Sequence, residues 1–334
     1  MNDLYKDKKN IILQVDNLKK YFNVKKNIFS AKKECVKAVD EVSFNIQSGE
    51  ILGLIGESGC GKTTLVKTIL GLLKPTSGAV FFKGQKISSL TQNQIRLLRS
   101  KIQIIFQDPY SSLNPKISVG DVLYEVLKVH GVVSRKQIKS QIYRLLDMVG
   151  LPKNSFSKYP HEFSGGQRQR IGIARALAVD PEFIVCDEVV SALDVSVQAQ
   201  ILNLLIELRE ERNLTLLFIS HDLSVVEYIS DRIAVMYLGK IIDMLDTKKI
   251  YSDSIHPYTA SLISSIPSLN ISKKNNRLVL QDDISNSIKI SSGCSFFTKC
   301  PIANKDNIPI QKCIDVSPVL LEKKDSHFVS CHQY

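Results

Sequence analysis

The sequence predicts an α/β fold in which parallel strands are covered on both faces by helices. Apolar runs of four or five residues recur along the chain at 51–55, 102–106, 183–186, 215–219 and 233–236. Stretches with helical periodicity lie between them, such as the one from Val197 onward, whose isoleucine and leucine side chains share one face. Short apolar runs that alternate with helices are typical of strands buried on both sides.

Other segments are expected to extend this core. Runs typical of strands also occur at 11–15, 42–46 and 79–82. The polar, Lys-rich stretch from Asn23 to Lys37 is predicted to be a surface loop. Residues 120–180 show no strand pattern and are predicted to form a helical insert. After Pro267 the chain turns rich in Asn, Ser and Lys over 268–287, which is typical of a linker.

Composition narrows the class of protein. The chain has 334 residues, of which 44% are hydrophobic and 23% charged, so it can bury a core, which a disordered chain cannot. No apolar run approaches the roughly 18–20 residues that cross a bilayer, and the start lacks the apolar segment of a secretory signal. We therefore expect a cytosolic protein.

Positive charge is concentrated at the N-terminus. The net charge is +11, and residues 1–37 carry ten lysines against four acidic residues. Such a segment is suited to anionic lipid or nucleic acid, or it is simply a solvated surface.

A glycine-rich motif points to phosphate binding. GESGCGKTT fits G-x-x-x-x-G-K-[ST], follows a predicted strand and precedes a predicted helix. The loop can curl so that its N–H groups bind phosphate oxygens, Lys62 would reach the outer phosphates, and Thr63 would ligate Mg²⁺. The alternative is a glycine turn before a helix. The predicted ATP-binding residues here are Gly56, Glu57, Ser58, Gly59, Cys60, Gly61, Lys62, Thr63 and Thr64.

Cys60 lies inside this loop. Positive surroundings are expected to lower the pKa of its thiol. We therefore expect alkylation of Cys60 to block ATP binding and Mg-ATP to protect the thiol.

A second motif supplies carboxylates. In FIVCDE (183–188) an apolar run ends in two acids, so a buried strand would deliver them at its tip. Asp187 is predicted to hold Mg²⁺ and Glu188 to act as the general base toward water. Taken alone, the pair would be a solvated turn.

Further motifs make the set specific. FSGGQ (163–167) resembles the signature motif of the ATP-binding-cassette (ABC) ATPases, and Gln107, the SALD motif (191–194), His221 and Tyr21 are similar to that family's glutamine loop, D-loop, switch histidine and adenine-stacking aromatic. The motifs appear in the family's order and cover residues 15–240. Longer stretches resemble the oligopeptide/dipeptide importer branch, and its F-type ATPase subunit in particular. Nickel importers share much of this pattern, so the solute stays open.

The resemblance implies a fold and a division into domains. It implies a P-loop NTPase with a RecA-like core, an antiparallel β subdomain and a helical subdomain over about 108–178. The ABC ATP-binding domain would span 1–267, and 268–334 would form a linker and a short Cys-containing C-terminal extension.

The resemblance also implies roles for the remaining site residues. Two such ATPases pair head to tail around two ATPs. Tyr21 would stack on adenine, Gln107 would sense Mg²⁺ and water, and His221 would contact the γ-phosphate. The residues implied to contact ATP across the dimer interface are Ser164, Gly165, Gly166, Gln167 and Asp194. Their structural alternatives are a core aromatic for Tyr21, a polar residue leaving a strand for Gln107, a structural histidine for His221 and a Ser-capped helix start for 164–167.

Partners and location follow from the same resemblance. The partners would be a second ABC ATPase subunit, a paralogue rather than an identical copy, two membrane permease subunits and a solute-binding protein, with this chain at the cytoplasmic side of the cell membrane. The family has DEP where this chain has Asp187-Glu188-Val189. Loss of the proline frees a backbone angle, which puts the hydrolysis rate in question.

Four of the seven cysteines crowd the tail: Cys294, Cys300, Cys313 and Cys331. In the importer branch such a quartet is implied to hold a [4Fe–4S] cluster; Zn²⁺ and free thiols are the alternatives, and His327 and His332 are substitute ligands.

The leading hypothesis is an ATPase that powers peptide import. A soluble ABC ATPase acting on nucleic acid would suit the basic N-terminus and the basic segment 270–334, which has nine basic and six acidic residues. We nevertheless expect no nucleic acid partner, because the chain has one cassette and a short insert. A regulatory subunit that hydrolyses ATP poorly is the third possibility.

Overall fold

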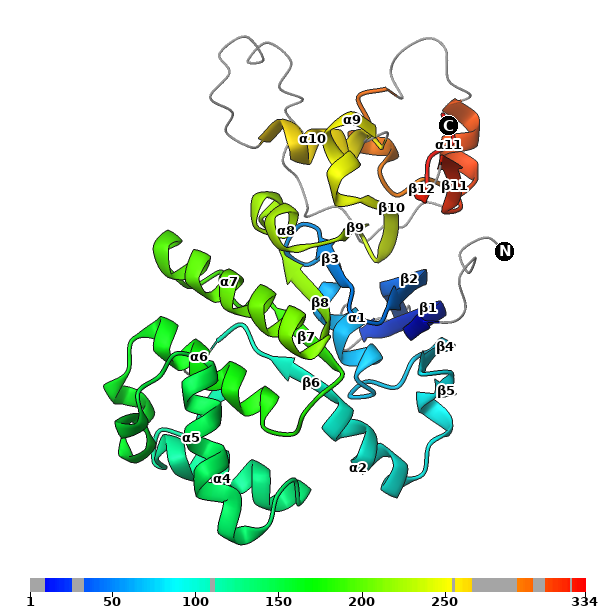
Figure 1. Cartoon of the computed structure of the whole chain (residues 1–334). Coiled ribbons are helices and arrows are strands. Elements are labelled where there is room, and N and C mark those ends of the chain that lie inside the picture. The colour runs from blue at the N-terminus through cyan, green and yellow to red at the C-terminus, as the bar shows by residue number, and fades with distance from the viewer. Residues whose placement is uncertain are drawn as a thin grey trace. The chain divides into compact units, whose positions relative to one another are not determined.

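The computed structural model describes residues 10–25, 33–108, 112–253, 256–265, 293–302, 310–324 and 326–334. The chain divides into two compact units (Figure 1): one combines residues 1–46, 52–88 and 221–334, and the other combines 47–51 and 89–220. The predicted linker at 268–287 and the predicted boundary between residues 267 and 268 lie outside the described residues.

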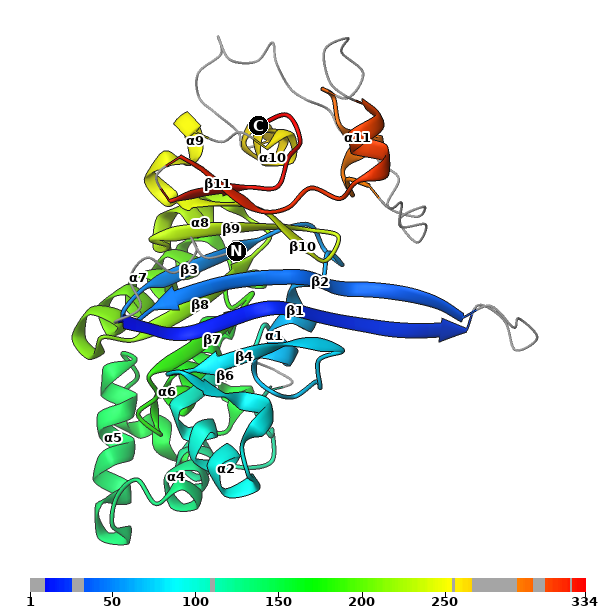
Figure 2. The ribbon, with the colours of Figure 1, turned by 90° about the vertical axis from the view of Figure 1, so that its right-hand side faces the viewer.

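The first unit contains a four-stranded sheet in the order β2-β1-β4-β5. Its strands are β1 (Ile11–Lys25), β2 (Lys33–Gln47), β4 (Ser77–Phe82) and β5 (Gln85–Lys86). β1 pairs antiparallel with β4, which places Leu13 opposite Phe82 and Val15 opposite Val80, all four of them buried. Figure 2 shows β1 and β2 side by side as long strands.

The predicted surface loop over residues 23–37 is wrong at both ends. β1 continues to Lys25, and β2 already begins at Lys33. Lysine is common on exposed strand surfaces, so a Lys-rich composition does not exclude a strand. The central residues 26–32 lie outside the described part of the chain.

The first unit also contains the strands on which the glycine-rich motif and the tail are built. They are β3 (Ile51–Ile55), β9 (Arg232–Tyr237), β10 (Lys240–Asp246), β12 (His327–Val329) and β11 (Leu321–Lys324), neighbours in that order. β3 and β9 are parallel, and the later pairs are antiparallel. The helices of this unit are α1 (Lys62–Ile69), α8 (Leu223–Ile229), α9 (Ile250–Asp253), α10 (Pro257–Ser265) and α11 (Ile310–Asp315). The C-terminal strands thus extend the sheet that contains β3.

The second unit has three parallel strands in the order β6-β7-β8: β6 (Ile102–Ile105), β7 (Phe183–Asp187) and β8 (Thr215–Ser220). Its helices are α2 (Gln92–Lys101), α4 (Val119–His130), α5 (Ile138–Met148), α6 (Gly165–Leu177) and α7 (Val195–Arg212). Residues 120–180 are helical as expected, since they contain α5, α6 and most of α4.

The strand predictions for the core are confirmed. The five apolar runs coincide with β3, β6, β7, β8 and β9, and their side chains are mostly buried. β10, β11 and β12 were not predicted. Among the described residues, no helix has the length and apolar character needed to cross a bilayer.

Candidate functional site

The phosphate loop, residues 56–64, joins β3 to α1 in the first unit. Gly61 precedes α1 with φ of 114°, in the region that favours glycine. A Cβ at Gly61 would lie 2.1 Å from the carbonyl oxygen of Ala38, and one at Gly56 would lie 2.3 Å from that of Met236. The backbones of β2 and β9 therefore approach the loop at distances that only glycine allows.

Lys62 is folded into this loop. It is only 5% exposed, and its Nζ donates hydrogen bonds to the carbonyl oxygens of Gly56, at 2.6 Å, and Glu57, at 3.0 Å. Thr63 is exposed at the first turn of α1, and Ser58 is exposed in the loop itself. The ammonium group is thus fixed at the loop, beside side chains open to solvent.

The turn after β9 is hydrogen-bonded to the phosphate loop. The Gly239 N–H donates to the Cys60 carbonyl oxygen at 2.8 Å, and the Asp40 N–H donates to the Gly239 carbonyl oxygen at 2.8 Å. These bonds connect the loop through the turn to β2.

The expected lowering of the Cys60 pKa is wrong. The side chain is 5% exposed, and burial raises the pKa of the thiol although Lys62 acts in the opposite direction. Desolvation disfavours the thiolate more than the nearby ammonium favours it.

We therefore expect the Cys60 thiol to react slowly with alkylating reagents. At neutral pH an alkylating reagent should modify the exposed Cys35 at least about tenfold faster than Cys60, because the thiolate is the nucleophile. The rate at Cys60 should rise with pH toward its raised pKa. Peptide mapping by mass spectrometry after timed alkylation measures both rates. Equal rates at neutral pH would contradict the assignment.

Tyr21 lies on β1, half-buried. Its hydroxyl donates to Asp40, and its backbone N–H donates to Thr76 Oγ1 at 2.9 Å. Burial alone would raise the pKa of Asp40, but the Tyr21 hydroxyl and the ammonium groups of Lys240 and Lys37 together lower it. The Tyr21 side chain is thus held in place by a hydrogen bond to the Asp40 carboxylate.

In the second unit, the structure brings Gln107 and Glu188 together. Gln107 Nε2 donates to Glu188 Oε2 at 2.8 Å. Glu188 follows the last residue of β7 with φ of 50°, a left-handed conformation that few residues other than glycine adopt. Its N–H donates to the Ile219 carbonyl oxygen of β8 at 3.0 Å, and its carbonyl oxygen accepts from the Ser191 N–H at 3.1 Å. These bonds hold the strained residue in place.

The neighbours of Glu188 are fixed by packing. Asp187 ends β7 opposite Ile219 and is half-buried. Val189, which stands where the related family has proline, is 2% exposed, as is Val190. The segment is therefore anchored by apolar contacts, and the effect of Val189 on the hydrolysis rate stays a prediction.

The signature residues form the start of α6. Ser164 is the N-cap and Gln167 completes a capping box: Gln167 N–H donates to Ser164 Oγ at 3.3 Å, and Ser164 N–H donates to Gln167 Oε1 at 3.1 Å. A Cβ on Gly166 would lie 2.3 Å from Val197 Cγ1, so this glycine lets α6 approach α7. Gly165 is half-buried beside it.

Asp194 caps the neighbouring helix α7 in the same way. Its Oδ1 accepts from the Val197 N–H at 3.0 Å and from Ser196 Oγ at 2.8 Å. The Val197 N–H is the main cause that lowers the pKa of Asp194. Because Val197 also packs on Gly166, the predicted signature and D-loop residues lie together.

His221 directly follows β8 and precedes Asp222, the N-cap of α8. Its side chain is exposed, and it belongs to the first unit, whereas Glu188 belongs to the second.

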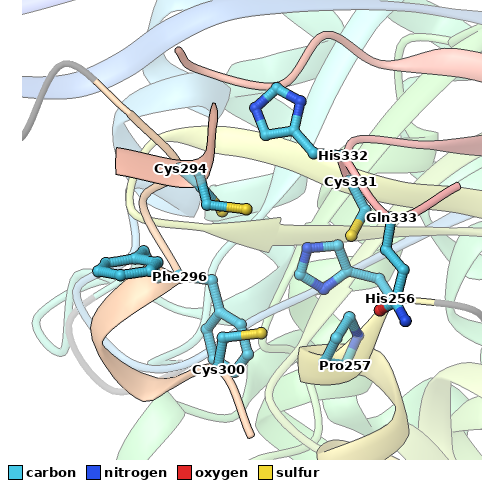
Figure 3. Close-up of a pocket in the computed structure, with 10 residues that line it drawn as sticks. His256, Pro257, Cys294, Phe296, Cys300, Cys331, His332 and Gln333 are labelled. Carbon is cyan, nitrogen blue, oxygen red and sulfur yellow. The ribbon is translucent and has the colours of Figure 1, made fainter. Parts of the chain in front are cut away.

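The four tail cysteines line one pocket of the first unit (Figure 3), which we call the cysteine pocket. Cys294, Cys300 and Cys331 turn their sulfur atoms toward a shared space, and Cys313 also lines it. The remaining lining residues are His256, Pro257, Phe296, Phe297, His332 and Gln333. The predicted substitute ligand His327 is absent from this set; its Nε2 lies 2.8 Å from Asp243 Oδ1 instead.

The cysteines of the pocket could bind a soft metal ion only as thiolates, that is, after they lose their protons. Burial raises the pKa of Cys294 to about 11 and is also the main cause that raises those of Cys313 and Cys331. Within the described ranges, no three His, Cys, Asp or Glu side chains are arranged to hold a metal ion. The quartet therefore places four sulfur donors around one pocket, and burial favours the protonated thiol at Cys294, Cys313 and Cys331.

Two residues of the site were missed by the sequence reasoning. Asp40 holds Tyr21, and the hydroxyl of Tyr258 accepts the Glu57 N–H at 3.3 Å. Tyr258 lies in the run HPYTA (256–260), for which the sequence predicts no role at the site. No local pattern reveals either contact, because both partners are distant in sequence.

Comparison with known families agrees with this geometry. Residues 39–191 match the family described as "ABC transporter", and residues 242–306 match "Oligopeptide/dipeptide transporter, C-terminal region". The second match includes Cys294 and Cys300.

Individual relatives cover nearly the whole chain. The chain is 48% identical to the oligopeptide transport ATP-binding protein AppF of Bacillus subtilis, over 97% of both chains. It is 45% identical to a putative peptide import ATP-binding protein of Brucella ovis, over 91% of this chain and 94% of the relative.

Solved structures resemble it too. CbiO1 of Clostridium perfringens, part of an ABC transporter complex, matches with a TM-score of 0.63 and 28% identity over 74% of this chain and 92% of that one. The ATP-binding cassette MJ0796, a dimer bound to ADP and Pi after hydrolysis, matches with a TM-score of 0.62 and 29% identity over 71% of this chain and 99% of that one.

Proposed function

This chain belongs to the ABC transporter ATPases, and we propose that it hydrolyses ATP to power the import of peptides through a membrane transporter. The observation that carries the proposal is the phosphate loop, whose closely packed glycines and buried Lys62 would surround a phosphate group. The names of the relatives, oligopeptide transport and peptide import, favour peptides over nickel and over nucleic acid.

The residues of the phosphate loop would bind the triphosphate. Lys62 would exchange its bonds to loop carbonyls for bonds to phosphate oxygens, and Thr63 and Asp187 would hold the Mg²⁺ that shields the phosphate charge. Tyr21 would stack on the adenine, with its ring fixed by Asp40.

Hydrolysis would depend on Glu188 as the general base. The hydrogen bond from Gln107 is the contact that supports this proposal, because it ties the base to a residue expected to follow Mg²⁺ and water. His221 would contact the γ-phosphate.

The second ATPase subunit would complete the site. Ser164 to Gln167 lie at the N-terminus of the 13-residue helix α6, where N–H groups and the helix dipole favour an anion. They would bind the ATP held by the partner subunit, and Asp194 would lie at the same interface. ATP joins two polar faces, and its hydrolysis lets them separate.

We assign the chain to the cytoplasmic face of the membrane. Its partners would be two membrane permease subunits, a solute-binding protein and an ATPase relative rather than an identical copy. The ABC family match and the transport names of the relatives support this assembly.

Uptake measurements test the proposal. In cells lacking this chain, uptake of a labelled oligopeptide should fall to background and return when the chain is supplied, while nickel uptake should not change. The Lys62→Ala variant should not restore uptake. Loss of nickel uptake with intact peptide uptake would move the chain to the nickel branch.

We propose in addition that the cysteine pocket holds a [4Fe–4S] cluster, with Zn²⁺ as the alternative. Cys294, Cys300, Cys313 and Cys331 would be the ligands, because thiolates are the donors both centres prefer. When bound, the cluster would supply a cross-link between tail segments.

Metal analysis tests the pocket. Protein purified without oxygen should contain iron and acid-labile sulfide, and Cys300→Ser should lose most of both, because the cluster loses one of four ligands. Cys35→Ser, at an exposed thiol outside the pocket, should keep them. Iron-free and zinc-free wild-type protein would mean that the thiols are free.

A further inference from the structure

Tyr258 connects the phosphate loop to Phe296, a residue that lines the cysteine pocket. It is fully buried on α10, and its hydroxyl accepts the Glu57 N–H of the loop at 3.3 Å. Burial is the main cause that raises the pKa of Tyr258, so the hydroxyl stays neutral. Tyr258 is therefore a fixed contact on the back of the loop.

The Tyr258 ring belongs to an aromatic cluster. Its centroid lies 4.7 Å from that of Tyr237, at the end of β9, and 5.6 Å from that of Phe296. Tyr237 and Phe296 also meet edge to face, at 5.3 Å. The three rings are buried and in mutual contact, so moving one of them changes the packing of the other two.

Phe296 is also part of the cysteine pocket. It lies between Cys294 and Cys300, is 1% exposed, and lines the pocket together with His256, whose ring is 5.7 Å away. In Figure 3, Phe296 is next to the sulfur-bearing side chains. The ring that packs against Tyr258 is therefore also a wall of the pocket.

The backbone near Phe296 depends on the tail. Cys294 N–H donates to the Cys313 carbonyl oxygen at 2.8 Å, and a Cβ on Gly293 would lie 2.2 Å from that same oxygen. The position of Phe296 is thus set by how α11 packs on the segment that carries Cys294.

We propose that Tyr258 positions the phosphate loop, and that Phe296 couples the affinity of the loop for ATP to the packing of the cysteine pocket. The proposal rests on the proposed ATPase function and adds a regulatory input to it. By linkage, whatever orders the pocket and strengthens ATP binding is itself bound more tightly when ATP is present.

The first test removes only the hydroxyl. Tyr258→Phe should raise the Kd of the full-length chain for Mg-ATP about two- to fivefold, because one long neutral hydrogen bond is lost. It should also shrink the rise in melting temperature that Mg-ATP gives, a readout that a purely structural role would leave unchanged. Tyr251→Phe is the matched control: it removes a hydroxyl of the same unit that bonds Glu227 at 2.6 Å.

The second test acts from the pocket. Phe296→Leu keeps the Tyr258 hydroxyl but opens the ring cluster, and it should weaken Mg-ATP binding about as much as Tyr258→Phe. The double variant should lose less than the product of the two factors, because both changes act on one contact. Phe297→Leu, at a partly exposed neighbour in the same pocket, should bind ATP like the wild type.

The outcomes separate this proposal from the function. If wild-type protein bound no Mg-ATP, the proposed function would fail. If wild type bound ATP but Tyr258→Phe and Phe296→Leu both matched their controls, the coupling would be wrong while the function stood. If Tyr258→Phe did not fold, Phe296→Leu with Phe297→Leu would decide alone.

Discussion

Glu188→Gln should bind Mg-ATP with near wild-type affinity yet hydrolyse it about 10²–10⁴-fold more slowly, the usual loss when a general base is removed. Glutamine keeps the shape of the side chain and its bond partner Gln107 but cannot accept the proton of the attacking water. With ATP retained, the variant mixed with its partner ATPase should accumulate as a closed dimer. Phosphate release and size-exclusion chromatography with Mg-ATP measure the two effects.

Glu207→Gln provides the control, because Glu207 is an exposed glutamate on α7 in the same unit. It should hydrolyse ATP like the wild type. Near-normal phosphate release by Glu188→Gln would exclude Glu188 as the base.

Gly61→Ala should reduce ATP affinity by at least about 100-fold, because the added Cβ costs both backbone strain and a clash. The residue has φ of 114°, and the new atom would lie 2.1 Å from the backbone oxygen of Ala38, which cannot turn aside as a side chain can. The loop or β2 must shift, and the N–H groups would lose their alignment. Titration with Mg-ATP measures the loss.

Gly172→Ala is the matched control. Gly172 lies inside α6, and a Cβ there meets no atom within 4 Å. The variant should bind ATP normally and be more stable by up to about 1 kcal/mol, since alanine favours helix over glycine. Wild-type affinity in Gly61→Ala would show that the phosphate loop tolerates a side chain.

Short-range patterns predicted the core of the fold well. The run at 51–55 is β3, residue for residue, because a buried parallel strand needs continuous apolar character and the glycine motif marks its end. The loop predicted at 23–37 is wrong at both ends, where β1 and β2 extend into it. A lysine-rich composition is compatible with an exposed strand as well as with a loop, so it could not distinguish the two.

Burial and contacts distant in sequence account for what was not predicted at the site. Positive surroundings were expected to lower the pKa of the Cys60 thiol, but burial of the side chain raises it. Likewise, nothing near Tyr258 indicates Glu57, which is 201 positions away. Glu188 and Gln107 were both predicted, yet their hydrogen bond depends on how β6 and β7 align.

The central claim is that each ATP is held between the phosphate loop of one ATPase subunit and the signature helix of the other. A structure of the Glu188→Gln variant, assembled with its partner ATPase and Mg-ATP, tests this directly. We predict that the Ser164 hydroxyl and the Gly166 N–H lie within hydrogen-bond distance of the γ-phosphate bound by the partner subunit. A closed, ATP-loaded assembly with α6 far from both triphosphates would contradict it.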